Sequence, residues 1–404
     1  MAGSDADAAV DVLVVGGGII GLASAWRARR RGLSVTVLDP DPGRGANQVA
    51  AGMLAPVTEL QYGEEPLLRL GLESNARYAE FAAELAEASG GMDLGYRRCG
   101  TLAVALDADD RAELREVHAF QRRLGLDAEW LTGRECRRLE PMLAPGVRGG
   151  LLARDDHQVD GRRLGAALTA ACERSGVVID RARAAELTYA DGTDGTDGAD
   201  GADAGGERQV VGARTGDGRL LRAGQTVLAA GSRSGELYDG LPVRPVKGQV
   251  LRLRMDGPFA GFLGRNVRAV VRGVHIYLVP RENGELVIGA TTEERGWDTT
   301  VTAGGVYELL RDAHELVPGI TELPLAETGA GLRPGSPDNA PMIGPTGVPG
   351  LVAATGHGRN GVLLTAVTGE LVAELLATGR VPELAAPFSP TRFRRPESAE
   401  VRAS

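Results

Sequence analysis

Three glycines near the N-terminus have the spacing of a loop that binds phosphate: Gly16, Gly18 and Gly21. They follow an apolar run over residues 12–15 and open a helix that we expect over residues 20–31. Glycines there permit a tight turn, let a pyrophosphate approach the backbone and let the helix lie close to the strand, and amides at a helix N-terminus bind phosphate. Asp39 ends a second apolar run, where a carboxylate can accept hydrogen bonds from ribose hydroxyls. The pattern predicts a dinucleotide-binding βαβ unit; the alternative is a tight turn that holds no ligand.

A second glycine cluster lies near the C-terminus: Gly356, His357, Gly358, Arg359, Asn360 and Gly361. It stands between a strand expected over residues 351–355 and an apolar helix expected over residues 361–378. The positive end of that helix would stabilise negative charge at the N1–C2=O edge of a reduced isoalloxazine, whereas a nicotinamide has less use for it. The cluster therefore favours FAD over NAD; the alternative is that its glycines only serve the geometry of a helix start.

The composition indicates a globular protein and argues against several functions. The 404 residues are 43% hydrophobic and 25% charged with a net charge of -9, which speaks against nucleic-acid binding. The three cysteines have neither metal-ligand nor disulfide-framework spacing. We expect a cytoplasmic protein without a membrane span, because no signal-peptide pattern and no run of about 18 apolar residues occurs. The acidic, glycine-rich residues 191–206 are expected to form a disordered hairpin tip rather than a calcium site.

The periodicity predicts an α/β protein, α+β overall, with two domains. A Rossmann-like domain is assembled from discontinuous segments: residues 1–60, 150–240 and 335–385. Its further elements are one helix and two strands: residues 160–175, 177–180 and 226–231. A smaller antiparallel-sheet substrate domain is expected from two segments: residues 61–149 and 241–334. It contains two amphipathic helices and a β-meander: residues 66–88, 107–124 and 248–289. Residues 386–404 form a C-terminal tail.

Short motifs distributed along the chain carry a family likeness: Ala51-Gly52-Met53-Leu54, Pro245-Val246-Lys247-Gly248-Gln249, Tyr277-Leu278-Val279-Pro280-Arg281, Gly289-Ala290-Thr291 and Gly331-Leu332-Arg333-Pro334. Together with the two glycine clusters and Asp39 they resemble the D-amino-acid oxidase superfamily, and within it the glycine oxidases of thiamine biosynthesis. The resemblance extends in order from Val12 to about Thr378. It implies an FAD-dependent enzyme that oxidises glycine or a similarly small amine to an imine, which yields glyoxylate, ammonia and hydrogen peroxide.

The resemblance implies a role for particular side chains. Arg333 and Tyr277 would bind the substrate carboxylate, Arg359 would lie near flavin and substrate, His275 would line the entrance, and Met53 would run past the flavin ring. A guanidinium and a phenol that fix a carboxylate would aim the Cα–H at flavin N5. Judged without the family, Tyr277 would be a core aromatic residue and Arg333 a solvated loop cation. The residues implied to contact the cofactor are Gly16, Gly18, Ile19, Ile20, Gly21, Asp39, Pro40, Ala46, Asn47, Ala51, Gly52, Met53, Ala185, His357, Gly358, Arg359, Asn360, Gly361, Val362 and Leu363.

The resemblance also concerns partners, and alternatives stay open. It implies O2 as electron acceptor, a homotetramer, and thiazole synthase as the recipient of the imine. FAD is expected to bind non-covalently, because residues 331–345 contain no cysteine. Thr292 stands where relatives can carry a bulkier methionine, which bears on the size of the pocket. The alternatives are oxidation of sarcosine or D-amino acids, a quinone-linked dehydrogenase, and a flavin-binding module without turnover.

Overall fold

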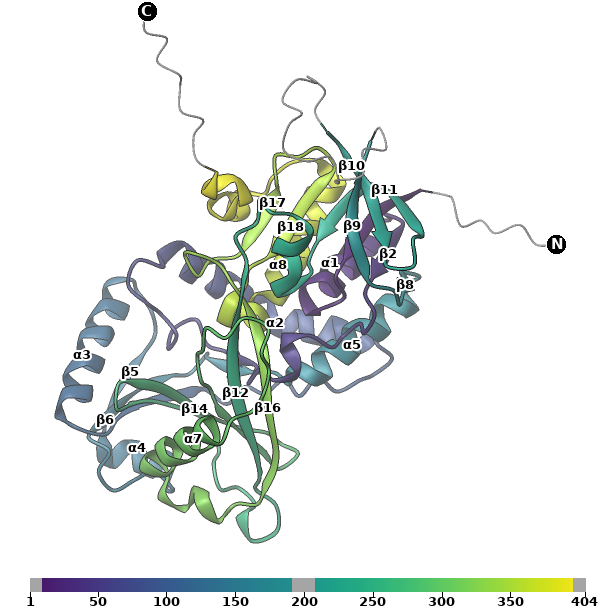
Figure 1. The fold of residues 1–404 in the computed structure, drawn as a ribbon. Coiled ribbons are helices and arrows are strands. Elements are labelled where there is room, and N and C mark those ends of the chain that lie inside the picture. Colours follow the sequence, from purple (N-terminus) through teal and green to yellow (C-terminus); the bar gives the residue numbers. More distant parts are fainter. Residues whose placement is uncertain (1–8, 191–207, 395–404) are drawn as a thin grey trace, which may run out of the picture.

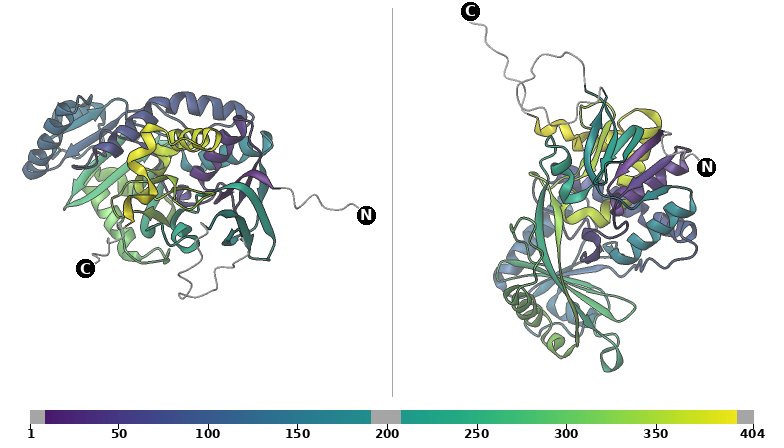
Figure 2. Two further views of the ribbon diagram at one scale, coloured as in Figure 1. Left: turned by 90° about the horizontal axis from the view of Figure 1, so that it is seen from above. Right: turned by 45° about the vertical axis from the view of Figure 1, so that its right-hand side comes forward.

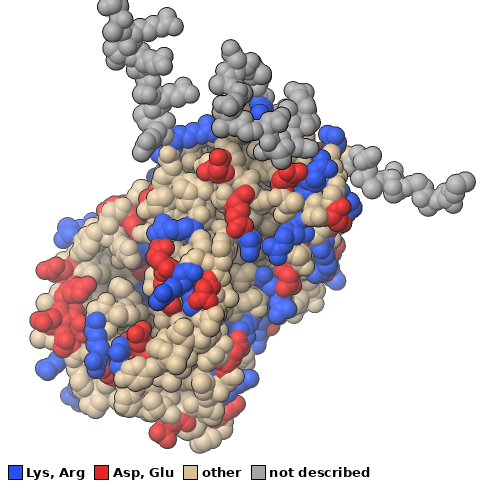
Figure 3. All heavy atoms as spheres, viewed as in Figure 1, with Lys and Arg blue, Asp and Glu red and all other residues tan. Residues whose placement is uncertain are grey.

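Two β-sheets with their covering helices make up the protein in the computed structural model, which describes residues 9–190 and 208–394 (Figure 1). One sheet is largely parallel and the other largely antiparallel, which confirms the predicted fold class. Two long strands, β12 (Arg244–Arg254) and β16 (Leu325–Gly335), run between the two parts of the molecule (Figures 1 and 2). On the face shown in Figure 3, acidic and basic side chains are interspersed.

The first sheet has the strand order β17-β18-β11-β1-β2-β8, with β10 and β9 attached beside β11. Its five central strands are parallel: β18 (Leu351–Thr355), β11 (Leu220–Leu228), β1 (Val10–Val15), β2 (Val35–Leu38) and β8 (Val178–Asp180). Three antiparallel strands complete it: β17 (Met342–Pro345), β10 (Val210–Thr215) and β9 (Ala184–Tyr189). The last four residues of β1 are buried, because helices or strands cover both faces of a parallel sheet.

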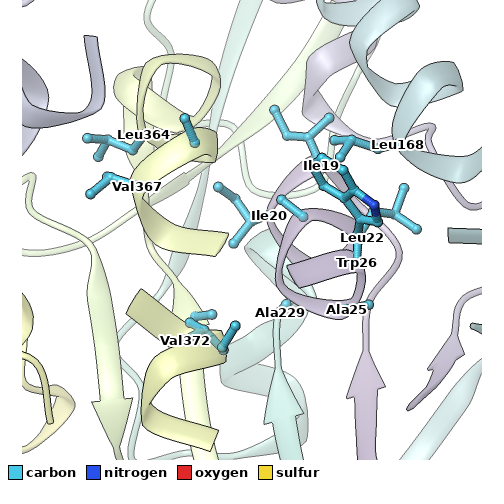
Figure 4. Close-up of a cluster of buried hydrophobic side chains, with 14 of the residues drawn as sticks. Ile19, Ile20, Leu22, Ala25, Trp26, Leu168, Ala229, Leu364, Val367 and Val372 are labelled. Carbon is cyan, nitrogen blue, oxygen red and sulfur yellow. The ribbon is translucent and has the colours of Figure 1, made fainter. Parts of the chain in front are cut away.

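Four helices form the core with this sheet: α1 (Ile19–Arg30), α2 (Glu65–Ala88), α5 (Gly161–Arg174) and α8 (Gly361–Thr378). The helices α1 and α8 approach closely, because a Cβ on Gly369 would lie only 3.1 Å from the Cβ of Ala23. Figure 4 shows Ile20 of α1 between the two helices, with Leu364 and Val367 on α8. By length and composition α8 could cross a membrane, but 72% of that apolar segment is buried inside the protein. Its apolar sequence therefore serves the core.

The position of α2 differs from the predicted domain division, which placed residues 61–149 in the substrate domain. Leu70, Tyr78 and Leu85 of α2 are fully buried in the same cluster as α1 and α8. Amphipathic periodicity indicates that a helix has a buried face, but not which core that face joins. Conversely, β6 (Gly149–Ala153) falls mostly within the segment predicted for the Rossmann-like domain, yet it pairs in the second sheet.

The second sheet has the strand order β16-β12-β15-β14-β13-β4-β6-β5. The strands not yet described are β15 (Glu285–Gly289), β14 (Val274–Pro280), β13 (Asn266–Val271), β4 (Thr101–Ala105) and β5 (Glu129–Thr132). Neighbouring strands are antiparallel except β13 and β4. Three helices pack on this sheet: α3 (Ala108–Arg123), α4 (Gly133–Leu139) and α7 (Ala303–Leu316). This sheet, like the first, has eight strands among the described residues.

Most predicted helix ends lie within two residues of the observed ones, as for the helix predicted over residues 160–175 and observed as α5. The strand predicted over residues 226–231 begins earlier, at Leu220, because its first half pairs with β10.

The two-stranded pair of β3 (Met53–Leu54) and β7 (His157–Gln158) brings distant segments together. The acidic insert predicted at residues 191–206 lies outside the described residues, and β9 and β10 on either side of it pair antiparallel.

Candidate active site

The three loop glycines serve different purposes. Gly16 has a φ of +108°, and a Cβ there would lie 2.4 Å from the carbonyl oxygen of Ala229. A Cβ on Gly21 would lie 1.9 Å from the carbonyl oxygen of Gly16, so this glycine lets α1 pack against the end of β1. Gly18, the N-cap of α1, has no protein atom within 4 Å of the position that a Cβ would take. Two glycines are therefore required by the protein's own packing, and the third leaves open space for a ligand.

The N-terminus of α1 offers free amides, since it has neither a capping side chain nor an acidic residue in its first turn. Asp39 follows β2, and its Oδ2 accepts a hydrogen bond from the amide of Gly17 at 2.7 Å. The side chains of Ile19 and Ile20, both predicted to contact the cofactor, are buried in the helix core, so only their backbones can face a ligand. Exposed Pro40 follows Asp39 directly.

The loop after β2 is held by Asn47, which was predicted to contact the cofactor. Its Nδ2 donates to the carbonyl oxygens of Gly43 and Gly161, both at 2.9 Å, and its side chain is buried. Asn47 therefore ties this loop to the start of α5, while its neighbour Ala46 is exposed. Ala185 is exposed on β9, whose buried residue Leu187 packs in the same cluster as the end of β2.

The second glycine cluster forms a 3-10 turn, η5 (Gly358–Asn360), that leads directly into α8. Gly356 and Gly358 have φ angles of +73° and +52°, which favour glycine. Neither the N-cap Asn360 nor any acidic residue caps the start of α8, so this end also has free amides. Of the other predicted contacts here, Val362 and Leu363 are buried, and their carbonyl oxygens accept hydrogen bonds from Tyr78 and Ser74 of α2.

His357 in this cluster is 2% exposed, and its Nε2 lies 3.0 Å from the hydroxyl of Thr368. Burial lowers the pKa of its imidazole from 6.5 to about 3. The unfolded chain therefore binds a proton at this residue between these two pH values while the folded chain does not. The free energy of unfolding must then decrease as the pH falls through this range, by up to ~1.4 kcal/mol per pH unit.

We expect His357→Gln to reduce this acid sensitivity. Thermal unfolding of the wild type should show a Tm that falls steadily below pH 6.5, and the variant should show a shallower slope. The exposed residue His314 provides the control, because His314→Gln also removes one imidazole but not a buried one. Equal slopes in wild type and His357→Gln would show that His357 does not carry the effect.

A row of glycines forms a flat floor on the second sheet beneath Tyr277 and Arg333. A Cβ on Gly289 would lie 2.4 Å from the Tyr277 hydroxyl, and a Cβ on Gly248 would lie 2.5 Å from Nη1 of Arg333. Gly289 pairs directly with Tyr277, and Gly331 pairs with Gly248. The absence of side chains at these positions lets the phenol and the guanidinium lie against the sheet, which brings together the two residues predicted to bind a carboxylate.

Arg333 has no acidic partner in the part of the chain that the structure describes. Its Nη1 donates to the carbonyl oxygens of Thr291 at 3.1 Å and Lys247 at 3.4 Å. In residues 9–190 and 208–394 no carboxylate forms an ion pair with Arg333, whereas the neighbouring Lys247 is paired with Glu293 and Asp298. Burial raises the pKa of Tyr277 while the Arg333 guanidinium opposes that rise. The site thus presents a partly buried cation and a protonated phenol to an anion.

The segment predicted to run past the flavin ring packs on the same face. Ala51 and Met53 form a small apolar cluster with Tyr277, Val279 and Val287. The tight path of this segment requires glycine, because Gly52 has a φ of +70° and a Cβ there would lie 1.9 Å from the carbonyl oxygen of Val159.

Arg281 holds this segment in place, a role that the sequence analysis did not assign. Its Nη2 donates to the carbonyl oxygen of Ala51 at 2.5 Å, and its Nη1 donates to Val159 and Gln158. The side chain is buried, and this burial lowers the pKa of Arg281 to about 10. The only signal in the sequence was its place at the end of the Tyr277–Arg281 motif.

A small hollow, open to solvent, lies between the segment after β3, the start of α2 and the start of α8. Arg359 lines it and pairs with Glu64, while Glu59, also in its wall, pairs with Arg268 at 2.8 Å. No sequence pattern indicated Glu59, Glu64 or Arg268, because their partners are distant in the chain. His275 is exposed on the same face of β14 as Tyr277, and partial burial and the nearby Arg268 lower its pKa.

These features fit FAD. Two helix N-termini with free amides, the open space at Gly18 and the carboxylate of Asp39 suit a dinucleotide with a pyrophosphate. The loop at residues 16–21 follows β1 and the cluster at 356–361 follows β18, and these two strands lie on either side of β11 in one sheet, so a single extended ligand can reach both.

Comparison with known proteins gives the same result. The family described as FAD dependent oxidoreductase matches residues 11–375. The chain is 36% identical to the bifunctional protein ThiO/ThiG of Synechocystis, over 95% of this chain but only 54% of that protein, so it spans about half the length of such relatives. It is 32% identical to the hydrogen cyanide synthase subunit HcnC of Pseudomonas aeruginosa, over 97% of this chain and 98% of that one.

Two solved structures have the same fold over nearly their whole length. Glycine oxidase of Geobacillus kaustophilus superposes with a TM-score of 0.83 at 31% identity, over 95% of this chain and 98% of that one. Iminodiacetate oxidase of a Chelativorans species superposes with a TM-score of 0.79 at 26% identity, over 94% of this chain and 98% of that one. The sequence, the fold and the site agree, and the chain belongs to the family of FAD-dependent oxidoreductases that includes the amine and amino-acid oxidases.

Proposed function

We propose that this chain catalyses the oxidative deamination of glycine, or of a similarly small amino acid such as sarcosine, with O2 as electron acceptor. The amino acid loses two electrons and two protons to O2, so that an imine and hydrogen peroxide form. With glycine as substrate, water then converts the imine to glyoxylate and ammonia, whereas the imine from sarcosine would release methylamine in place of ammonia. Bound FAD would take the hydrogen and the electron pair from the substrate Cα and deliver the electrons to O2.

The observation that carries this proposal is the guanidinium of Arg333 beside Tyr277 on the glycine floor, which no carboxylate of the described residues pairs. A substrate carboxylate would complete the ion pair that Arg333 lacks, and the Tyr277 hydroxyl would donate a hydrogen bond to it. Fixing the carboxylate at two points orients the Cα and the amine, and such orientation is a large part of catalysis. The glycine oxidase and iminodiacetate oxidase folds support this substrate class.

Oxygen uptake and peroxide formation with glycine, sarcosine and D-alanine test the proposal. We expect turnover with glycine or sarcosine, and peroxide in equal amount to the oxygen consumed. Peroxide with none of the three would refute the oxidase. Flavin that bleaches with glycine under nitrogen but does not recover in air would instead indicate a dehydrogenase that uses another acceptor. The thiazole synthase partner and the homotetramer stay predictions from the resemblance.

The glycine floor gives a prediction about substrate binding. In Gly248→Ala the new methyl group overlaps the guanidinium of Arg333, which is the flexible end of a side chain and can move away. We expect the Tm to change little, while the KM for glycine rises at least about tenfold, because an error of ~1 Å in placing a substrate group can cost that much or more. Gly304→Ala in α7 is the control, since no atom lies within 4 Å of its added methyl. An unchanged KM in Gly248→Ala would contradict this role of the floor.

A further inference from the structure

Two carboxylates stand in the wall of the hollow at the start of α8, and each forms an ion pair with an arginine. Glu59 pairs with Arg268 at 2.8 Å, and Glu64 pairs with Arg359, also accepting a hydrogen bond from Asn339. Their side chains are 17% and 13% exposed, so both acids are largely removed from bulk water. Neither acid belongs to the set of residues that the motifs suggested for catalysis or cofactor binding.

Both ion pairs lie near the residues that would hold the substrate. Arg268 is directly opposite Tyr277 in the β13–β14 pairing, so the two side chains stand next to each other on one face of the sheet. Glu59 acts electrostatically on both Tyr277 and His275. Glu64 and Glu59 line the same hollow as Arg359. A substrate that is bound to Arg333 and extends past Tyr277 would approach the Glu59–Arg268 pair first and then the hollow that Glu64 lines.

The charges of this site balance for one carboxylate only. Arg333, Arg268 and Arg359 contribute three positive charges, and Glu59 and Glu64 contribute two negative charges, which leaves one positive charge on Arg333. One substrate carboxylate neutralises it. A second carboxylate on the substrate would have no free cation to bind, because Arg268 and Arg359 are already paired. It would also lie near the carboxylates of Glu59 and Glu64 in a region of reduced dielectric, where like charges repel more strongly than in water.

We propose that Glu59 and Glu64 make the site selective for amino acids with a single carboxylate. The inference rests on the proposed function in assigning the first carboxylate to Arg333. It predicts that iminodiacetate, which carries a carboxymethyl group on the amine of glycine, is rejected by charge and not by size. This chain would then differ from the iminodiacetate oxidase that shares its fold.

Binding of two unreactive ligands to the FAD-loaded enzyme tests this directly. Methoxyacetate has the shape of sarcosine and one carboxylate, and diglycolate has the shape of iminodiacetate and two. Their Kd values are read from the perturbation of the flavin absorption spectrum at low ionic strength, where charge effects are least screened. The variants are Glu59→Gln, Glu64→Gln and both together. Glu65→Gln is the control, because exposed Glu65 is the neighbour of Glu64 in the sequence but does not line the hollow.

We expect the wild type to bind methoxyacetate at least about tenfold more tightly than diglycolate, which corresponds to ~1.4 kcal/mol. The double variant should bring the ratio of the two Kd values close to one, each single variant should lower it in part, and Glu65→Gln should leave it unchanged. A ratio that stays the same in the double variant would overturn the proposal. If the ratio responds as expected but neither glycine nor sarcosine is oxidised, the selectivity stands and the proposed reaction is wrong.

Discussion

Arg333→Ala is expected to raise the KM for glycine by about 100-fold or more while the bound flavin keeps its absorption spectrum. A partly buried guanidinium that binds a carboxylate in a charge-assisted pair contributes about 3 kcal/mol or more, and removing one partner leaves the other charge without compensation. Arg333 has no acidic partner among the described residues, so its loss leaves no protein carboxylate unpaired and the fold should tolerate it. Steady-state oxygen uptake gives KM, and the flavin spectrum reports the cofactor.

Arg333→Lys separates charge from shape. Lysine keeps the positive charge but cannot form the two parallel hydrogen bonds of a guanidinium, so we expect a KM between those of wild type and Arg333→Ala. Arg244→Ala removes a cation from the same sheet at an exposed position and should have little effect. If Arg333→Ala leaves the KM for glycine near the wild-type value, Arg333 does not bind the substrate carboxylate.

Gly18→Ala is expected to weaken FAD binding by about tenfold or more without disturbing the empty protein. The added methyl would meet no protein atom within 4 Å, so any loss of affinity must come from the ligand that approaches this backbone. Gly21→Ala is expected to be much more severe, because its methyl would lie 1.9 Å from a backbone oxygen that cannot move without shifting the loop. Flavin retained after purification and the Kd for added FAD measure both effects.

The two variants should also differ in stability. Without FAD, Gly18→Ala should have the Tm of the wild-type apoprotein, whereas Gly21→Ala should have a lower one. With FAD in excess, the Tm of the wild type should rise more than that of either variant, because a ligand stabilises the folded state by RT ln(1 + [L]/Kd), which is larger for the lower Kd. Wild-type FAD affinity in Gly18→Ala would show that no phosphate approaches this residue.

The parts of the fold that the sequence predicted well are those in which local pattern and burial coincide. The glycine loop could be recognised because strand, turn, helix and Asp39 follow within one short stretch. The helix α8 was predicted with its observed ends because an apolar run begins after a glycine cluster and ends before Gly379, which adopts a left-handed conformation. In both cases the information lies among neighbours in the chain.

The parts that could not be predicted depend on partners that are distant in the sequence. The amphipathic pattern of α2 shows one buried face, yet nothing in it specifies packing against α8, almost 300 residues later, as in the hydrogen bond from Ser74 to the carbonyl of Leu363. Arg281 looked like an ordinary charged residue at the end of a strand, and only the fold brings Ala51 to it. Glu59 and Glu64 stand in an irregular segment with no periodicity, so their pairing with Arg268 and Arg359 had no signal.

The placement of α8 has a consequence for how the protein is made. The phosphate-binding loop leaves the ribosome long before α8, which together with α2 and α5 covers the apolar face of α1 next to that loop. Between the two, the chain must complete the second sheet and return to add β18 beside β11. The surface of α1 that packs on α8 therefore stays uncovered until α8 has been made, a state that favours aggregation or chaperone binding. Cofactor loading should accordingly be a post-translational event, and a chain stopped before residue 361 should fail to retain FAD although it contains the whole loop.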